Sequence, residues 1–427
     1  MRRNFGRIIL AFSMLCAAGQ ATAQEAKQAD TADGCDAACA AQSQPTEQSK
    51  KLPQGSAAER KARMNERANA KSYTKTFDLS GLPHYVPQEK VSGTLRVSGN
   101  NYVDFSPLGK WWKEAFEKYQ PGIRIEYNLP TAAIAVPTLY LDLADIGINH
   151  EPSFYDGLAH LRVKGTEPVG ISVLTGSYDY VGWQNNIVII VNEKNPLAKI
   201  TMPQLDGIFG SVRDGGWVGQ TWHPEFARGA DKDIRTWGQM GLAGEWADKP
   251  IHVHGFAIRY ATATEFGAKV LQSSDKWNGD LHTYANFKKP DGRTYLEANQ
   301  IFDHVKADPY AIGYIRFHQG FPPGVRILDV ARDANSPAVK YTIDSLQDRS
   351  YPLWGDQSFW LSLRPGQALD PKVREFTRFV LSREGQELVQ RDGKYLPLSA
   401  AVAKEELRKL EKIGVPAASS TRTGGSP

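Results

Sequence analysis

Residues 250–271 (PIHVHGFAIRYATATEFGAKVL) place a short strand, a loop and a helix start beside side chains that could bind an anion. Thr262 and Glu265 have the S/T-x-x-E spacing of a capping box, in which each side chain satisfies a backbone N–H of the other residue. Such a junction directs free N–H groups and the positive end of the helix dipole at one point, which favours a negatively charged ligand. An ordinary helix start without a ligand is the alternative interpretation.

The same stretch contains the spacing H-x-H at His252 and His254, which puts both imidazoles on one face of a strand as candidate metal ligands. Asp145 or Glu265 could complete such a site. Since no third histidine has a suitable spacing, we favour a structural pair and expect no metal or other cofactor. The chain also has no phosphate loop, nucleophile elbow or zincin motif. We therefore expect no enzyme activity, with a secreted hydrolase or an adhesion, matrix or chaperone-like protein as the alternatives.

Alternating strands and helices must position these residues, and the alternation predicts an α/β architecture. Apolar runs predict strands at 94–97, 123–127, 143–148 and 186–192. Helix starts are predicted at five capping residues, namely Ser106 (before Pro107), Thr131, Thr201 (with Gln204 in a second capping box), Asp370 and Ser382.

The first 23 residues have the layout of a cleavable signal peptide. Three arginines flank the start of the apolar run 8–18, and Ala21-Thr22-Ala23 is an A-x-A cleavage signal, so we expect a periplasmic or secreted protein. Cleavage removes those three arginines and no acid, so the formal net charge falls from +4 to +1. This near-neutral balance argues against nucleic acid as a partner.

Residues 24–89 are predicted to be a disordered tether, because the stretch up to about residue 72 has hardly a large apolar side chain to bury. Residues 413–427 are predicted to be a second disordered tail. Cys35 and Cys39 remain after cleavage, and either a small local disulfide or two free thiols would suit an oxidising compartment.

Between these ends, about residues 90–412 resemble the phosphate-type periplasmic substrate-binding proteins of ABC transporters. Residues 351–398 resemble the family's "FxxFVLSxEGQ…DGYLPL" ending. VNEKNPLAKITMPQLDGIFGS (191–211) is similar to the family's "VNxxNPLxxLTxxQLxxIFxG" segment. ADPYAIGYIRF (307–317) matches its "PGAIGY" strand, and LADIGI (143–148) matches its "ADIG" strand.

The resemblance implies a type II periplasmic-binding-protein fold, in which two α/β lobes are joined by two crossover strands and close on a ligand in the cleft between them. It implies that residues 90–185 and 312–412 form lobe 1 and that residues 186–311 form lobe 2. It further implies a monomeric solute-binding protein that delivers phosphate or a related small anion to an ABC permease in the inner membrane.

The family's ligand loops can be carried over residue by residue. The first corresponds to Ser98-Gly99-Asn100-Asn101-Tyr102, and the second to residues 129–133, where only Thr131 offers a hydroxyl. The family's strand Asp corresponds to Asp145, with a structural turn carboxylate as the alternative. Asn185 and Asn186, near the expected first crossover, could also reach the cleft.

The fourth ligand segment departs from the family. Phe256 stands where the family has its anion-binding Arg, and Tyr260-Ala261-Thr262 replaces a small SGT run. Arg259 either supplies the lost cation or faces solvent. The candidate ligand-binding residues are Ser98, Asn100, Asn101, Tyr102, Thr131, Asp145, Arg259, Tyr260 and Thr262.

This departure has an energetic consequence. A bidentate Arg–oxyanion pair is charge-assisted, and losing about 3 kcal/mol weakens binding roughly a hundredfold. Phe256 and Tyr260 would also make the pocket narrower and less polar. We therefore expect a diverged member that binds an anion weakly, or one that binds a different ligand with an apolar or aromatic part.

Overall fold

The computed structural model describes residues 73–180, 183, 185–317 and 323–414. The signal peptide, most of the predicted tether with Cys35 and Cys39, and nearly all of the predicted tail lie outside the described residues. None of the helices in these ranges is both long and apolar enough to cross a membrane.

The first of two five-stranded sheets has the strand order β2-β1-β3-β16-β4. β1 (Ser92–Gly99) runs parallel to β2 (Gly122–Asn128) and to β3 (Ile146–Asn149). β16 (Asp356–Leu361) is antiparallel to both β3 and β4 (Val169–Thr175). The alternating apolar runs thus form the strands that the sequence predicts, with ends shifted by a few residues.

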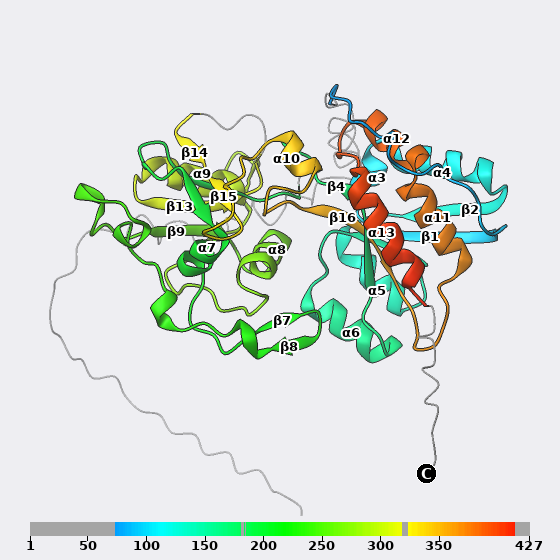
Figure 1. The fold of residues 1–427 in the computed structure, drawn as a ribbon, viewed down its shortest axis with the longest axis horizontal. Helices are drawn as coiled ribbons and strands as arrows, with labels where there is room; N and C mark the ends of the chain where they lie inside the picture. Colours follow the sequence, from blue (N-terminus) through cyan, green and yellow to red (C-terminus); the bar gives the residue numbers. More distant parts are fainter. Residues whose placement is uncertain (1–72, 181–182, 184, 318–322, 415–427) are drawn as a thin grey trace, which may run out of the picture. The chain divides into compact units, whose positions relative to one another are not determined.

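Seven α-helices among the described residues flank this sheet, and the C-terminal helix α11 (Pro371–Leu381) lies beside β1, far from it in sequence (Figure 1). Asp370 and Ser382 cap α11 and α12 as predicted. Ser106 does not cap α4, because Pro107 takes the N-cap position. The helices are α3 (Tyr102–Phe105), α4 (Leu108–Tyr119), α5 (Ala135–Tyr140), α6 (Phe154–Lys164), α11 (Pro371–Leu381), α12 (Arg383–Asp392) and α13 (Ala400–Lys412).

The second sheet repeats the pattern of four strands in one direction and one reversed strand, in the order β10-β9-β13-β5-β14. β9 (His252–Phe256) lies parallel to β10 (His282–Tyr284) and β13 (Ala311–Ile315). β5 (Val188–Asn192) is antiparallel to β13 and to β14 (Val325–Ile327). The repetition makes each sheet the centre of one α/β lobe.

The helices of the second lobe begin with α7, whose predicted capping box of Thr201 and Gln204 is confirmed. The α-helices are α7 (Met202–Phe209), α8 (Ala261–Val270), α9 (Glu297–Ala307) and α10 (Ile343–Gln347). Short 3-10 turns are η2 (Ala132–Ile134) in the first lobe, then η3 (Pro224–Phe226), η4 (Ala230–Lys232), η5 (Gly238–Met240) and η6 (Gly244–Trp246).

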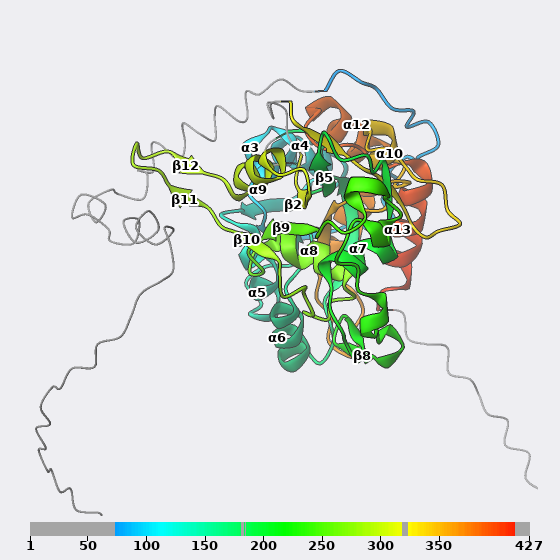
Figure 2. The ribbon, with the colours of Figure 1, turned by 90° about the vertical axis from the view of Figure 1, so that its left-hand side faces the viewer.

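Three two-stranded ladders complete the elements, and β11 and β12 extend away from the sheets (Figure 2). The ladders are β6 (Lys199–Thr201) with β15 (Asp329–Ala331), β7 (Gly216–Val218) with β8 (Thr221–His223), and β11 (Phe287–Lys288) with β12 (Thr294–Tyr295).

Two of the expected segment boundaries are wrong, namely the return to lobe 1 at residue 312 and the end of the tether at residue 89. Residues 312–315 belong to β13, in the middle of the second sheet, and the chain rejoins the first sheet only at β16. Residues 311–315 (AIGYI) are an apolar run that either sheet could bury. Their pairing with β5 and β9 places them in the second sheet. The predicted tether also extends too far, because Leu79, Leu82 and Tyr85 are buried in the first core.

Each sheet has its own hydrophobic core. The first contains Trp112 and Phe116 of α4, and the second contains Phe256, Phe266 and Tyr314. Two cores joined by two chain crossings agree with the implied two-lobed α/β fold.

Candidate functional site

A polar contact joins the two lobes at their centre, and we call His150, Glu265 and Arg316 the junction cluster. His150 directly follows β3, Glu265 lies in α8, and Arg316 directly follows β13. His150 Nε2 lies 3.2 Å from Glu265 Oε1, and Arg316 NH2 donates to Glu265 Oε2 at 2.8 Å. All three side chains are largely buried, at 12%, 6% and 19% exposed respectively.

The junction cluster is close to neutral in charge. Burial lowers the pKa of His150, so its imidazole is uncharged at neutral pH. Arg316 keeps its positive charge and is balanced by the Glu265 carboxylate. An anion that approached Arg316 would therefore compete with an internal carboxylate.

The start of α8 differs from the sequence prediction. Tyr260 is the N-cap residue, and no side chain makes a capping hydrogen bond there, so the predicted Thr262–Glu265 capping box is wrong. The Glu265 carboxylate faces Arg316 and His150 instead. As at any helix start, the N–H groups of Ala261 and Thr262 have no acceptor within the helix, and Thr262 is buried at 7% exposure.

The first predicted ligand loop lies at the carboxyl end of β1, where Asn100 N donates to Ile148 O at 2.8 Å. Gly99 has φ +131°, and a Cβ there would lie 2.2 Å from Ile148 O, so this approach requires glycine. Asn100 Oδ1 accepts from the N–H of Tyr102 at 2.9 Å. The hydroxyl of Ser98 is buried and has no hydrogen-bond partner among the described residues.

The second predicted loop lies against the first. Asn101 Nδ2 donates to Pro130 O at 3.3 Å, and Thr131 Oγ1 accepts from Ala133 N at the start of η2. The structure thus brings Asn101 and Thr131 to the same end of the first sheet as Ser98, Asn100 and Tyr102.

Asp145 lies apart from these candidates. Its two carboxylate oxygens accept from the Arg96 side chain at 2.6 and 3.2 Å, and Oδ2 also accepts from Arg96 N at 2.8 Å. Asp145 is level with Arg96 at the amino end of β3, about 13 Å before the carboxyl end at Asn149. These contacts are those of a structural carboxylate, which was the alternative interpretation. Asp145 does not lie with the predicted loop residues.

The fourth segment places its residues in three different surroundings. Phe256 is 1% exposed and packs on Tyr314, with ring centroids 5.7 Å apart, so it belongs to the second core. Tyr260 is half-buried, and its hydroxyl accepts from Asn286 N at 3.0 Å. Arg259 is exposed, and no described residue forms an ion pair with it.

Asn185 and Asn186 lie where the two chain crossings meet. Asn186 is fully buried, donates to Gly176 O at 3.0 Å and Ser177 O at 2.8 Å, and accepts from Gly355 N at 2.7 Å. Asn185 Oδ1 accepts from Arg316 NH1 at 3.4 Å. Asn186 therefore ties one crossing to the other, while Asn185 links a crossing to the junction cluster.

A polar cavity of about 290 Å³ adjoins the junction cluster and is lined by residues of both lobes, His150 and Glu265 among them. Its charged lining is mixed, with the acidic residues Glu151, Asp356 and Glu406 and the basic residues Lys269, Arg349 and Lys409. Burial, with the carboxylates of Asp356 and Glu265 nearby, raises the pKa of Glu151 to about 7. The cavity therefore suits a small polar solute better than an apolar one.

His252 and His254 do not form a metal site with Asp145 or Glu265, whose partners are Arg96 and Arg316. His252 Nδ1 lies 2.5 Å from Asp308 Oδ2, and His254 Nδ1 lies 2.8 Å from the hydroxyl of Tyr284. Within the described part of the chain, no group of three or more His, Cys, Asp or Glu side chains could hold a metal ion.

Two members of the junction cluster, His150 and Arg316, were not predicted from the sequence. Each is a single polar residue directly after an apolar strand, at the carboxyl edge where α/β folds bind ligands. That position is the one signal that could have indicated them.

Two known proteins are similar in sequence to this chain over most of its length. The phosphate-binding protein PstS of Pseudomonas aeruginosa PAO1, and that of strain UCBPP-PA14, are each 25% identical over 330 residues, covering 77% of this chain and 90% of the relative. No protein-family model matches. The resemblance inferred from the motifs is thus confirmed over most of the chain.

Solved structures are also similar to this chain. An ABC-type phosphate transport receptor from Vibrio cholerae is 16% identical with a TM-score of 0.42, over 71% of this chain and 99% of the receptor. PstS from Borrelia burgdorferi is 14% identical with a TM-score of 0.41, over 73% of this chain and all of that chain. Because these TM-scores are low, the evidence for the fold is the pair of sheets described above.

Proposed function

We propose that this chain, which is PstS-like over 330 residues, is an exported solute-binding protein of an ABC-type uptake system. Its ligand is phosphate or a related small oxyanion, held between the two lobes and delivered to a permease in the inner membrane. The observation that carries the proposal is the buried Arg316, which pairs with Glu265 of α8, while the same carboxylate lies 3.2 Å from His150 at the carboxyl end of β3 in the other lobe.

The binding step follows from the contacts of the junction cluster. A bound oxyanion would replace Glu265 as the partner of Arg316, and the N–H groups of Ala261 and Thr262 would add donors from the start of α8. Because Glu265 must be displaced, the net gain is small. This competition supports weak oxyanion binding, in line with the loss of the family's Arg at Phe256.

The second candidate is a solute with an apolar or aromatic part. It is favoured by the half-buried ring of Tyr102, whose centroid lies 5.0 Å from that of Trp183 in the first loop region. Trp183 is buried in the first core, so the exposed part of the Tyr102 ring is what would contact a carbon skeleton.

Calorimetric titration of the chain from residue 24 with inorganic phosphate, and with sulfate for comparison, tests the proposal. We expect saturable binding of phosphate that is weaker than micromolar. Micromolar or tighter binding would contradict the argument from Glu265 and Phe256. No saturable binding of either anion would remove the oxyanion proposal and leave the second candidate. Permease and ATPase genes beside this gene would support the transport role.

A further inference from the structure

A second cavity, of about 280 Å³, lies between the first lobe's α6 and the second lobe's β7–β8 hairpin and α8. Five of its lining residues are aromatic, among them Trp217 and Trp360, and three are acidic, namely Glu151, Glu167 and Asp275. No Lys, Arg or His is among the described residues that line it. We call it the aromatic pocket.

The β7–β8 hairpin lies beside α6 of the first lobe (Figure 1), and its tip residues Gly219 and Gln220 line the pocket. Gln220 N donates to Glu167 Oε1 at 3.1 Å, and Gln220 Nε2 donates to Phe154 O at 3.0 Å. Gly219 has φ +57°, and a Cβ there would lie 2.1 Å from Glu167 Oε2. The closure therefore depends on a glycine at the tip and on the Glu167 carboxylate opposite it.

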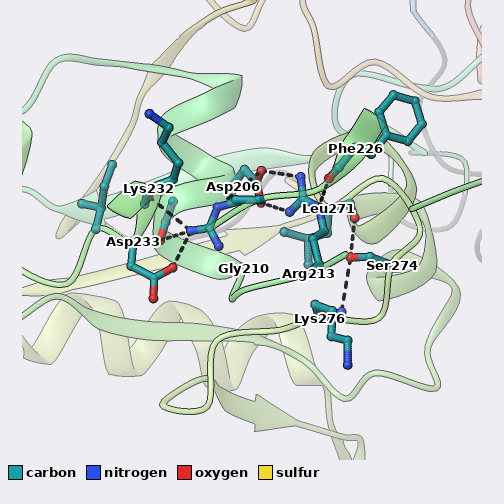
Figure 3. Close-up of polar contacts among 12 residues, drawn as sticks. Asp206, Gly210, Arg213, Phe226, Lys232, Asp233, Leu271, Ser274 and Lys276 are labelled. Carbon is teal, nitrogen blue, oxygen red and sulfur yellow. Dashed lines mark hydrogen bonds and ion pairs between the residues drawn. The ribbon is translucent and has the colours of Figure 1, made fainter. Parts of the chain in front are cut away.

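The base of the hairpin is held by charged contacts, which Figure 3 shows. Arg213 donates to both oxygens of Asp206 in α7, at 2.6 and 2.7 Å, and to Phe226 O at 2.9 Å. Bidentate pairs of this kind fix geometry as well as charge. The wall that carries Trp217 is thus anchored to the second lobe.

Trp217 is fixed further by its own contacts. Its backbone N–H donates to Gln272 O at 2.8 Å, and its ring centroid lies 5.0 Å from that of Phe154 and 5.1 Å from that of Trp222. Because its neighbours hold this ring on several sides, the aromatic wall is formed before a ligand arrives.

The lining determines the class of ligand. Aromatic faces carry negative potential and attract cations placed within about 6 Å of the ring centre. The carboxylates of Glu167 and Asp275 add negative charge with no basic side chain in the lining to balance it, so an inorganic anion is repelled. A cavity of about 280 Å³ suits a small organic molecule.

We propose that the aromatic pocket binds a small organic cation, an amine or a quaternary ammonium compound. This is a site separate from the proposed oxyanion site at Arg316. Because residues of both lobes line it, a bound cation favours the state in which the hairpin lies against α6.

The test uses choline as the probe, with the chain from residue 24 and tryptophan fluorescence as the readout. The control ligand is the neutral alcohol in which carbon replaces the nitrogen of choline. We expect saturable binding of choline, at least about tenfold tighter than binding of the neutral alcohol. Equal binding of the two, or no saturable response to choline, overturns the proposal.

Matched variants locate the site. Trp217→Leu removes a ring, and Glu167→Gln removes a charge while keeping an acceptor for Gln220 N. Each should weaken choline binding about fivefold to tenfold. Trp246→Leu and Glu225→Gln change a ring and a charge of the second lobe outside the pocket lining and should change binding less than about twofold. Equal effects in both sets overturn the assignment.

Two further measurements separate loss of choline binding from misfolding and from failure of the oxyanion site. If Trp217→Leu fails to fold, as judged by circular dichroism, Glu167→Gln against Glu225→Gln decides. Phosphate titration of Glu167→Gln should match the unmodified chain, so failure of the cation site and failure of the oxyanion site are distinguished.

Discussion

Arg316 and Glu265 are joined by a 2.8 Å hydrogen bond between side chains 51 residues apart in sequence. The Glu265 carboxylate is 6% exposed and also lies 3.2 Å from the imidazole of His150 in the other lobe. A buried cation with an internal carboxylate partner is stable without a ligand, and it can exchange that partner for an oxyanion of similar geometry. The contact therefore links the architecture of the lobes to the proposed binding.

Asp145→Asn separates a structural role from a ligand role. Since Arg96 occupies both carboxylate oxygens, the variant should lose about 2 kcal/mol of unfolding free energy and keep its phosphate affinity. Urea denaturation and calorimetry measure the two quantities. Loss of phosphate binding at unchanged stability would show instead that Asp145 contacts the ligand.

Asn186→Ala tests the joint between the chain crossings. The amide of Asn186 makes three hydrogen bonds to backbone groups and is fully buried, so its removal leaves those groups unsatisfied. We expect a loss of about 3 kcal/mol in unfolding free energy. Asn101→Ala removes one partly exposed hydrogen bond and serves as the control, with a loss of less than about 1 kcal/mol. Similar losses in the two variants would contradict the role given to Asn186.

His254 should make stability depend on pH in the acid range. Burial, with His282 and His304 beside it, lowers the pKa of His254 to about 4, whereas the unfolded chain protonates this histidine near its ordinary value of 6.5. The unfolded state therefore binds more protons between these values. The contribution of His254 to stability is fully present above about pH 6.5 and should fall by about 3 kcal/mol as the pH drops to 4.

Chemical denaturation across this pH range measures the effect of His254. Other groups titrate there too, so the comparison is with His254→Asn, which keeps a polar atom near Tyr284. The variant should show a shallower fall in unfolding free energy with decreasing pH. An identical slope in both proteins would contradict the depressed pKa.

Local patterns predicted much of the fold. Apolar runs indicated β1, β2, β3 and β5, and the capping residues Thr201, Asp370 and Ser382 mark helix starts in the structure. These signals depend on a few neighbouring residues, so the sequence alone carries them. The motif resemblance added the order of the lobes, which no local pattern supplies.

Long-range pairing accounts for what was missed. Thr262 and Glu265 have the capping-box spacing, yet Glu265 pairs with Arg316, because a buried guanidinium is a stronger partner than a backbone N–H. The apolar run of β13 could not reveal which sheet it joins. His150 and Arg316 meet at Glu265 only because the carboxyl ends of β3 and β13 face the same junction.

The most direct test of the account is the phosphate affinity of Glu265→Gln relative to the unmodified chain, measured by calorimetry. Arg316→Gln serves as the loss variant, and Glu406→Gln as a control that removes another carboxylate from the adjoining cavity. Removing the competing carboxylate frees Arg316 for the ligand, so Glu265→Gln should bind phosphate about tenfold more tightly than the unmodified chain. Arg316→Gln should not bind phosphate. Glu406→Gln should bind it as the unmodified chain does. Unchanged or weaker phosphate binding by a folded Glu265→Gln would contradict the account.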